Sequence, residues 1–336
     1  MRIAINGFGR IGRTILRAAM ADTHRCVEIV AINEPADAAT VAHLTQYDST
    51  HGTLSLPVSL EAANLRVGKN DIQLTQYEHS DDWDWSALKP DIVLECSGSF
   101  TSRQLAQRHI EAGAPKVLFS QPADDDVDAT VVWGVNEATI NATHTICSAA
   151  SCTTNAVIPP LQILDEAFGI QSGVITTIHS AMNDQPVIDA YHHTDLRKTR
   201  SAIQSIIPVD TELARGIGRI LPNMAGKFEA QAMRVPTINV SAMDVSIVVE
   251  QSVTVDDVNA ALQKASQTRL SNVLGYCTAP LASIDFNGNP HSGIVDASQT
   301  RVAGKKLVKI LVWFDNEWAY ANRMLDVAHH WTNLGD

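Results

Sequence analysis

Basic residues are scarce in this chain of 336 residues, where 25 Lys and Arg stand against 37 Asp and Glu. The resulting formal net charge of −12 argues against nucleic acid and anionic membrane surfaces as partners, because both are bound by dense basic patches. No apolar run reaches the roughly 18 residues that a membrane helix needs. The first residues, MRIAINGFGR, contain no apolar stretch of the signal-peptide kind. We therefore expect a cytoplasmic protein with no nucleic-acid and no membrane partner.

Cysteine is sparse as well, and its spacing is irregular. The chain has 5 cysteines and no C-x-x-C pair, which argues against a disulfide framework and against a structural zinc site. Adjacent histidines at 192–193 and 329–330 lack the i, i+4 spacing of a helical metal site, so we predict no bound metal. Trp83, Trp85 and Trp318 are expected to lie in the core rather than against a cofactor.

The first 150 or so residues alternate between strand-like and helix-like segments. Apolar runs at 2–6, 27–33, 91–96, 116–120 and 131–135 predict strands, and residues 13–21 and 102–112 have helical periodicity. Strands that alternate with helices are typical of a doubly wound, mostly parallel sheet. The length of the chain suggests about two domains. We therefore predict an α/β protein that begins with a Rossmann domain.

The second half has a different pattern. Longer β-rich runs occur at 173–179, 230–236, 239–249 and 306–314, with helix-like stretches at 256–267 and 316–332. This pattern predicts a second, α+β domain with a large mixed sheet. Pro159 and Pro160 lie within an otherwise helical pattern that starts at Cys152, and they weaken the prediction of a helix beyond its first two turns.

A glycine motif follows the first predicted strand. Gly7, Gly9 and Gly12 fit G-x-G-x-x-G, and their position before a predicted helix is typical of a pyrophosphate-binding turn. Glu34 follows the second predicted strand, where an acidic residue would accept hydrogen bonds from the ribose hydroxyls. Its charge would repel a 2′-phosphate, so the motif favours NAD over NADP. The alternatives are a glycine turn that binds nothing and a Glu34 that is only a solvated loop acid.

Cys152 carries the strongest chemical signal in the second half. It lies between a predicted strand at 145–148 and a helix-like stretch, and a helix N-terminus stabilises a thiolate. His179 ends a β-rich run and could stabilise that thiolate and then move a proton. The alternative is that the Cys152 and His179 side chains do not touch.

These segments together resemble the glyceraldehyde-3-phosphate dehydrogenase family of phosphorylating aldehyde dehydrogenases. The resemblance is carried in order by INGFGRIGR at 5–13, ASCTTN at 150–155, ITTIH at 175–179, DLRKTR at 195–200, RVPT at 234–237 and WFDNEWAYANR at 313–323. It implies an NAD-binding domain at 1–151 and 316–336, a catalytic domain at 152–315, a homotetramer, and a loop over 184–200 that reaches a neighbouring subunit's cofactor.

The resemblance also implies roles for single residues. Cys152 is expected to be the nucleophile and His179 the base, and Asn316 is expected to orient the nicotinamide. The remaining positions expected to bind the cofactor are Asn6, Gly7, Gly9, Arg10, Ile11, Gly12, Glu34, Ser120 and Tyr320. The positions expected to bind a phosphorylated aldose are Ser151, Thr153, Asp184, Arg197, Lys198, Arg200, Thr211 and Arg234.

Four positions depart from the common glycolytic pattern of the family. Met182 stands where a threonine is usual and cannot donate a hydrogen bond, and Lys198 stands where an arginine is common. Glu34 replaces the usual aspartate, and Glu212 replaces a glycine whose backbone meets inorganic phosphate. A carboxylate there would oppose a phosphate dianion, unless Glu212 points to solvent.

These departures resemble the branch of the family that oxidises D-erythrose 4-phosphate for vitamin B6 synthesis. The segments that carry this likeness are HSAMNDQ at 179–185 and IIPVDT at 206–211. The branch forms a thiohemiacetal and then a thioester on its cysteine, and water resolves the thioester to an acid. The alternatives are an ordinary phosphorylating enzyme of glycolysis and a nucleotide-binding regulator without catalysis.

Overall fold

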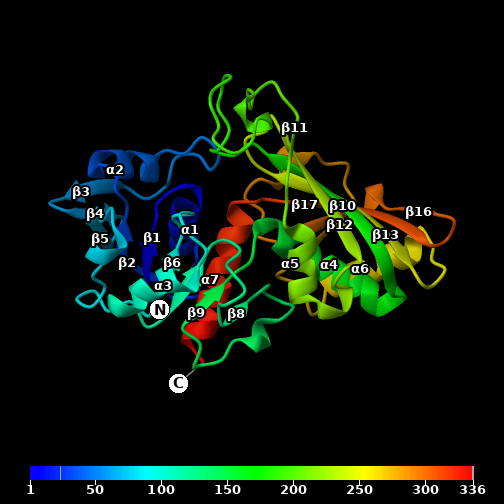
Figure 1. The fold of residues 1–336 in the computed structure, drawn as a ribbon, viewed down its shortest axis with the longest axis horizontal. Helices are drawn as coiled ribbons and strands as arrows, with labels where there is room; N and C mark the ends of the chain where they lie inside the picture. The colour runs from blue at the N-terminus through cyan, green and yellow to red at the C-terminus, as the bar shows by residue number, and fades with distance from the viewer. Residues whose placement is uncertain (23, 335–336) are drawn as a thin grey trace. The chain divides into compact units, whose positions relative to one another are not determined.

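The computed structural model describes residues 1–22 and 24–334. The chain forms two compact units, one made of Met1–Ser151 with the chain from Ala321 on, and the other of Cys152–Tyr320. The first unit has a mostly parallel sheet with helices and the second has a mixed sheet with helices, which confirms the predicted α/β class with a Rossmann-type domain and a second α+β domain (Figure 1). None of the helices in the described residues is long and apolar enough to cross a bilayer.

In the described part of the first unit, the strands form one sheet in the order β3-β4-β5-β2-β1-β6-β7-β9-β8. Its elements are β1 (Arg2–Asn6), α1 (Arg10–Ala21), β2 (Glu28–Asn33), α2 (Ala38–Gln46), β3 (Val58–Glu61), β4 (Asn64–Val67), β5 (Asn70–Thr75), β6 (Ile92–Glu95), α3 (Arg103–Glu111), β7 (Val117–Phe119), β8 (Ala129–Thr130) and β9 (Ile146–Ser148). Only the β3–β4 and β4–β5 pairs are antiparallel, so the carboxyl ends of the other strands meet at one edge.

The core of the first unit follows from its apolar runs. Ile3, Ala4 and Ile5 of β1 are fully buried, as expected for a central parallel strand that is covered on both faces. Helix α3 begins where the Ser102 hydroxyl accepts a hydrogen bond from the Leu105 N–H, a typical N-cap. Trp85 is fully buried, as predicted.

The predicted strand at 131–135 is wrong. Strand β8 ends at Thr130, and Gly134 has a φ of 83° within a turn in which the Val135 N–H donates to the Val132 carbonyl. The Asn136 side chain supplies the polar partners that a neighbouring strand would otherwise provide, since it accepts from the Val132 N–H and donates to the Thr130 carbonyl. Val131 and Val132 are buried in a turn, so their hydrophobicity misled the prediction.

In the second unit, the described strands form a sheet in the order β11-β12-β10-β13-β17-β15-β14, with β16 paired to β17. Its elements are α4 (Cys152–Phe168), β10 (Ile170–Ser180), β11 (Ile207–Val209), α5 (Leu213–Ile220), β12 (Phe228–Val235), β13 (Ser241–Val249), α6 (Val255–Ser266), β14 (Leu274–Cys277), β15 (Gly293–Asp296), β16 (Arg301–Ala303) and β17 (Leu307–Phe314). Helix α7 (Trp318–Thr332) begins in this unit, and from Ala321 on it belongs to the first unit. Short 3-10 helices lie in the first unit at Ser80–Asp82 and Glu137–Thr139. Those in the second unit are at Arg197–Thr199, Pro222–Met224, Ser283–Phe286 and Ala297–Gln299.

Helix α4 runs without a break through both prolines, although these residues weaken its prediction beyond the first two turns. Both rings are buried, and α4 packs on α6 and on strands β15 and β17 (Figure 1). Pro160 has no N–H to donate to the carbonyl of Ala156, and that carbonyl lies against Gly293 of β15, where a Cβ atom would come within 2.6 Å of it. The close packing of α4 on the sheet therefore outweighs the loss of helical hydrogen bonds.

Candidate active site

The glycine motif forms a tight turn between β1 and α1. Gly7 has a φ of 88°, and a Cβ on it would collide with the backbone of Ser97. A Cβ on Gly12 would collide with the carbonyl of Gly7, whereas one on Gly9 would meet nothing within 4 Å. The turn is thus closed by packing at two glycines and open at the third, as a site for a pyrophosphate requires.

A cavity of about 470 Å³ lies at the carboxyl edge of the first sheet, beside this turn. Of the predicted cofactor residues, Asn6, Gly7, Gly9 and Glu34 line it. The lining also includes residues that the sequence analysis did not identify, namely Asn33, Pro35, Tyr77, Glu78, Ser80, Trp83, Cys96, Ser97, Ser99, Phe100 and Leu105. Several of these end or directly follow a parallel strand, and that position is the signal that could have identified them.

Trp83 was predicted to lie in the core, and this prediction is wrong. It is half-buried, lines the cavity, and stacks on the ring of His109 with centroids 3.7 Å apart and an interplanar angle of 2°. His109 is fully buried and lies 3.0 Å from Glu95, and it accepts a hydrogen bond from the Trp85 indole. Glu95 also accepts from the Asn6 amide at 2.6 Å. This buried network therefore fixes the wall of the cavity and the last residue of β1.

Glu34 is anchored rather than merely solvated. One carboxylate oxygen accepts a hydrogen bond from the Phe8 N–H at 2.8 Å, within the glycine turn, and the other accepts from the Ala36 N–H at 3.3 Å. The side chain is half-buried and lines the cavity. A negative charge is thus held at the position where the ribose of a dinucleotide is expected.

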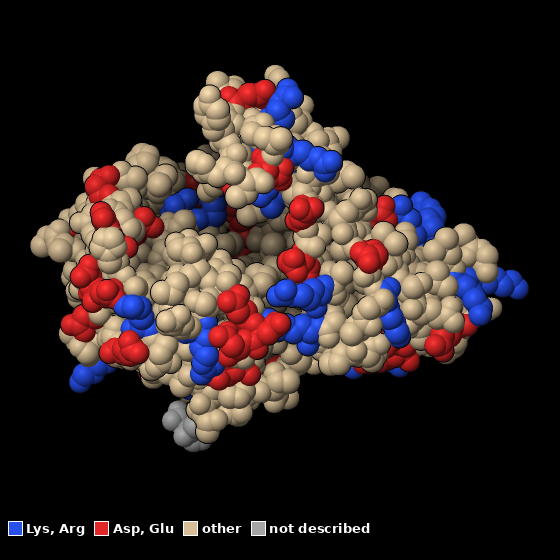
Figure 2. All heavy atoms as spheres, in the orientation of Figure 1, with Lys and Arg blue, Asp and Glu red and all other residues tan. Residues whose placement is uncertain are grey.

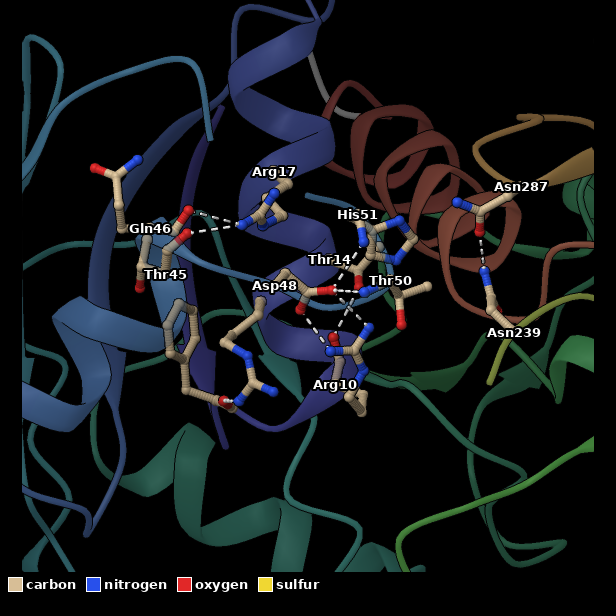
Figure 3. Close-up of polar contacts among 12 residues, drawn as sticks. Arg10, Thr14, Arg17, Thr45, Gln46, Asp48, Thr50, His51, Asn239 and Asn287 are labelled. Carbon is tan, nitrogen blue, oxygen red and sulfur yellow. Dashed lines mark hydrogen bonds and ion pairs between the residues drawn. The ribbon is translucent and has the colours of Figure 1, made fainter. Parts of the chain in front are cut away.

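Arg10 opens helix α1 and forms a two-pronged ion pair with Asp48 (Figure 3). Its Nη1 lies 2.5 Å and its Nη2 3.2 Å from the two carboxylate oxygens. Asp48 also accepts from the Thr50 and His51 N–H groups. Burial alone would raise the pKa of Asp48, but these hydrogen bonds hold it well below its usual range. Arg10 is therefore a fixed positive charge beside the first turn of α1.

The remaining predicted cofactor residues are distributed between the two units. Ile11 and Gly12 lie in the first turn of α1 with Arg10, and Ser120 follows β7 with its N–H on the carbonyl of Glu95. Asn316 follows β17, and its side-chain oxygen accepts hydrogen bonds from the hydroxyls of Ser180 and Ser241. The second unit also includes Tyr320, which is buried in α7.

Cys152 and His179 come together in the second unit. The sulfur lies 3.8 Å from Nε2 of His179, at the start of α4 and near the end of β10. The chain enters α4 through Ala150, whose φ of 57° is unusual for a residue with a Cβ. This short, bent entry places the thiol at the helix N-terminus, where the N–H groups of Thr153 and Cys152 face the sulfur.

The hydrogen bonds of His179 define its tautomer. Nδ1 lies 2.8 Å from the carbonyl of Ser180, which can only accept, and 3.2 Å from Nη1 of Arg234, which can only donate. The shorter contact favours a proton on Nδ1, which leaves Nε2 free to take one from the thiol. Burial, together with the charge of the nearby Arg234 guanidinium, lowers the pKa of His179 to about 4. Burial raises the pKa of Cys152 to about 11, which the charge of Arg234 and the helix amides oppose. In the free protein at neutral pH, the pair is therefore a thiol beside a neutral imidazole.

The residues predicted to bind substrate are only partly brought together. Arg234 is half-buried, with its Nη1 3.2 Å from Nδ1 of His179. Asp184 lies close enough to act electrostatically on both, and it forms an ion pair with Lys198 at 2.8 Å. Ser151 and Thr153 flank Cys152 in the chain. These positions form a group around the thiol and the imidazole.

Other predicted positions face the solvent. Arg197 is exposed, and Arg200 is exposed and paired with Asp189. Thr211 precedes α5 and accepts a hydrogen bond from the Leu213 N–H. The side chain of Glu212 is 78% exposed and lies 3.6 Å from Arg215. Of the two orientations considered for Glu212, the structure has the one that points to solvent.

Family comparisons agree with this arrangement in both units. Residues 1–103 match the family model described as glyceraldehyde 3-phosphate dehydrogenase, NAD binding domain. Residues 151–316 match the one described as glyceraldehyde 3-phosphate dehydrogenase, C-terminal domain. The protein is thus an NAD-dependent oxidoreductase. It belongs to the glyceraldehyde-3-phosphate dehydrogenase family, and its first domain binds NAD.

The residues around the glycine turn fit that cofactor. Gly9 leaves room for a pyrophosphate to approach the backbone, and the amides of the first turn of α1 favour its charge. Glu34 lines the cavity with a carboxylate, which is the group expected to accept hydrogen bonds from ribose hydroxyls and to oppose a 2′-phosphate. The predicted preference for NAD therefore has a direct structural basis in this unit.

Proposed function

We propose that this protein is a D-erythrose-4-phosphate dehydrogenase, which oxidises the aldehyde of D-erythrose 4-phosphate to 4-phosphoerythronate. The observation that carries the chemistry is the 3.8 Å contact between Cys152 Sγ and His179 Nε2, with the imidazole proton held on Nδ1 by Ser180. NAD supplies the hydride acceptor in this scheme. The product would enter vitamin B6 synthesis in the cytoplasm.

The oxidation begins with transfer of the Cys152 proton to Nε2 of His179. The sulfur then attacks the aldehyde carbon, and the carbonyl oxygen takes the proton from Nε2 of His179 to give a thiohemiacetal. In this scheme the backbone N–H of Cys152 and the protonated imidazole of His179 stabilise the negative charge that develops on the carbonyl oxygen. His179 next removes the hydroxyl proton as the hydride leaves, and a thioester remains on Cys152.

Water completes the reaction in this proposal. His179 first releases the hydroxyl proton to solvent. It then takes a proton from a water molecule, whose oxygen attacks the thioester carbon, and the carbon–sulfur bond breaks as that proton passes to the sulfur, which releases the acid and restores the thiol. Arg234 beside His179 provides a positive charge for the phosphate of the sugar, with Thr211 as a second partner.

Met182 favours the assignment of a four-carbon substrate over a three-carbon one. Its side chain is 45% exposed, its N–H is held by the Gln185 side chain, and its thioether has no hydrogen to donate. A hydroxyl at this position would hold the phosphate of a three-carbon sugar. Its loss is compatible with a phosphate that sits one carbon further from the sulfur.

The second candidate function is the phosphorylating oxidation of glyceraldehyde 3-phosphate, and Glu212 favours it. Because the carboxylate is 78% exposed and paired with Arg215, water and the arginine screen its repulsion of inorganic phosphate. Glu212 therefore does not exclude phosphate from the thioester.

Steady-state assays with the two aldehydes, each with and without phosphate, separate these functions. The proposal predicts a higher kcat/KM for erythrose 4-phosphate, with the acid as product even when phosphate is present. An acyl phosphate identified by ³¹P NMR, with glyceraldehyde 3-phosphate as the better substrate, would favour the alternative. Cys152→Ala serves as the control that should bind NAD but reduce none, and Glu212→Gly should change the product ratio less than about threefold.

We further propose that the protein is a homotetramer without nucleic-acid or membrane partners. The segment between β10 and β11 exposes apolar side chains, among them Val187 at 64%, Ile188 at 74% and Tyr191 at 103%, which a second copy of the chain would cover. Figure 2 shows Lys and Arg interspersed with Asp and Glu on the face that it draws, unlike a basic patch for nucleic acid. Light scattering at micromolar concentration measures the subunit number.

A further inference from the structure

Asn316 is held by two buried hydroxyl groups. Its side-chain oxygen accepts from Ser241 Oγ at 2.9 Å and from Ser180 Oγ at 3.1 Å. Ser180 is 0% and Ser241 1% exposed, whereas Asn316 is half-buried. The two serines therefore lie behind the amide, on the side away from solvent.

The sheet brings these residues together at the ends of three neighbouring strands. Ser180 is the last residue of β10, Ser241 is the first of β13, and Asn316 lies just beyond the end of β17. Ser241 pairs with Phe314 across the sheet, and its Oγ accepts from the Ser180 N–H at 3.1 Å. The strand register thus determines which residues contact the amide.

The hydrogen bonds define which end of the amide faces outward. A buried hydroxyl needs an acceptor for its proton, and the side-chain oxygen of Asn316 serves both serines. The opposite flip would leave both hydroxyl protons without this acceptor. The NH₂ group of Asn316 is therefore the end that points away from the serines, and it can only donate.

The backbone beside Asn316 is fixed as well. Asp315 is 1% exposed, and one of its oxygens accepts from the N–H groups of Glu317 and Trp318 at the start of α7. The other accepts from the Gly288 N–H at 2.7 Å. Ser180 also accepts the Nδ1 proton of His179 on its carbonyl. The residue that orients the catalytic base through its backbone thus orients Asn316 through its side chain.

We propose that Ser180 and Ser241 are positioning residues that lock the Asn316 amide as a donor toward the carboxamide oxygen of the nicotinamide. This inference rests on the proposed role of Asn316 at the nicotinamide end of NAD. It makes the two hydroxyls determinants of cofactor affinity and of selectivity for a carbonyl acceptor, although neither hydroxyl touches the cofactor.

The test compares binding of NAD with binding of ADP-ribose, which lacks the nicotinamide, by calorimetry without aldehyde. Ser180→Ala and Ser241→Ala should each weaken NAD about fivefold, the scale of one lost hydrogen bond, and leave ADP-ribose within about twofold. The double variant should weaken NAD more than either single variant. Thionicotinamide adenine dinucleotide carries a sulfur, a poor acceptor, in place of the carboxamide oxygen. The serine variants should weaken its binding less than they weaken NAD binding, so the ratio of the two affinities should fall.

Two further variants distinguish the possible failures. Ser246→Ala, further along β13 at a half-buried position, is the matched control and should change neither affinity. Asn316→Asp removes the donor and should weaken NAD without weakening ADP-ribose. If Asn316→Asp does so while the serine variants leave the ratio of the two affinities unchanged, the positioning role is overturned. If Asn316→Asp leaves the ratio unchanged too, the proposed place of Asn316 in the cofactor site is wrong.

Discussion

The ion pair between Arg10 and Asp48 should contribute strongly to the stability of the first unit. The carboxylate side chain is only 3% exposed and that of Arg10 25%, and the carboxylate also holds the Thr50 and His51 N–H groups. Removing one partner of a fully buried pair costs about 3–5 kcal/mol. A quarter of the Arg10 side chain stays in water, and the side-chain oxygen of an asparagine at position 48 can still accept from the Thr50 and His51 N–H groups. We therefore expect Asp48→Asn to lower the free energy of unfolding by about 2–3 kcal/mol.

The pH dependence of this effect has a definite sign. The folded-state pKa of Asp48 lies below the unfolded value of about 3.9, so its stabilisation is complete above that pH and is lost as pH falls through the folded pKa. The difference between the protein and Asp48→Asn should therefore be constant from pH 8 to about 5. It should shrink below about pH 4.

Urea unfolding provides the assay, with hydrogen exchange of peptides from α1 and residues 45–52 to assign the loss to the first unit. The matched control is Glu28→Gln, because the pair of Glu28 with Arg2 is 58% and 42% exposed and should contribute no more than about 0.5 kcal/mol. If Asp48→Asn lowered the free energy of unfolding at pH 7 no more than this control does, burial would not determine how much the ion pair contributes to stability.

Three other predictions follow from single contacts. Iodoacetamide should alkylate Cys152 faster as pH rises from 7 to 10, because burial raises its pKa to about 11 and only the thiolate reacts, whereas a plateau reached by pH 7 would contradict this. Glu34→Gln keeps an acceptor for the Phe8 N–H but loses the charge, so the NAD to NADP affinity ratio from titrations should fall at least about fivefold, and an unchanged ratio would remove the ribose assignment. Gly293→Ala should destabilise the second unit by about 1–3 kcal/mol in thermal melts, since its Cβ would come within 2.6 Å of the Ala156 carbonyl; an unchanged melting temperature would show that α4 can shift.

Much of the fold follows from local patterns in the sequence. The run that forms β1 and the capped helix α3 were predictable, because burial on two faces and an N-cap each leave a signature of a few residues. The wrong strand at 131–135 and the unexpected length of α4 both reflect non-local effects. Val131 and Val132 are buried in a turn completed by the Asn136 side chain, and α4 continues through Pro160 because its neighbours pack against it.

The candidate site was predictable to a similar extent. The Cys152–His179 contact could be suggested but not established, since it depends on the register of β10 in the sheet. The orientation of Glu212 depends on a partner in the next turn of α5, and the exposure of Trp83 depends on the stacked ring of His109. Side-chain directions of this kind are set by tertiary packing, which no spacing in the sequence records.

The three glycines of the turn meet two different requirements, close packing within the fold and room for the cofactor. Gly7 and Gly12 are required by the fold itself, because any side chain there would push β1, α1 and the segment after β6 apart. Gly9 has open space around it, so the polypeptide alone would tolerate alanine there. Selection for folding therefore acts on two of the three glycines, and selection for cofactor occupancy acts on the third. Gly9→Ala would therefore probe coenzyme recognition without a steric clash within the polypeptide.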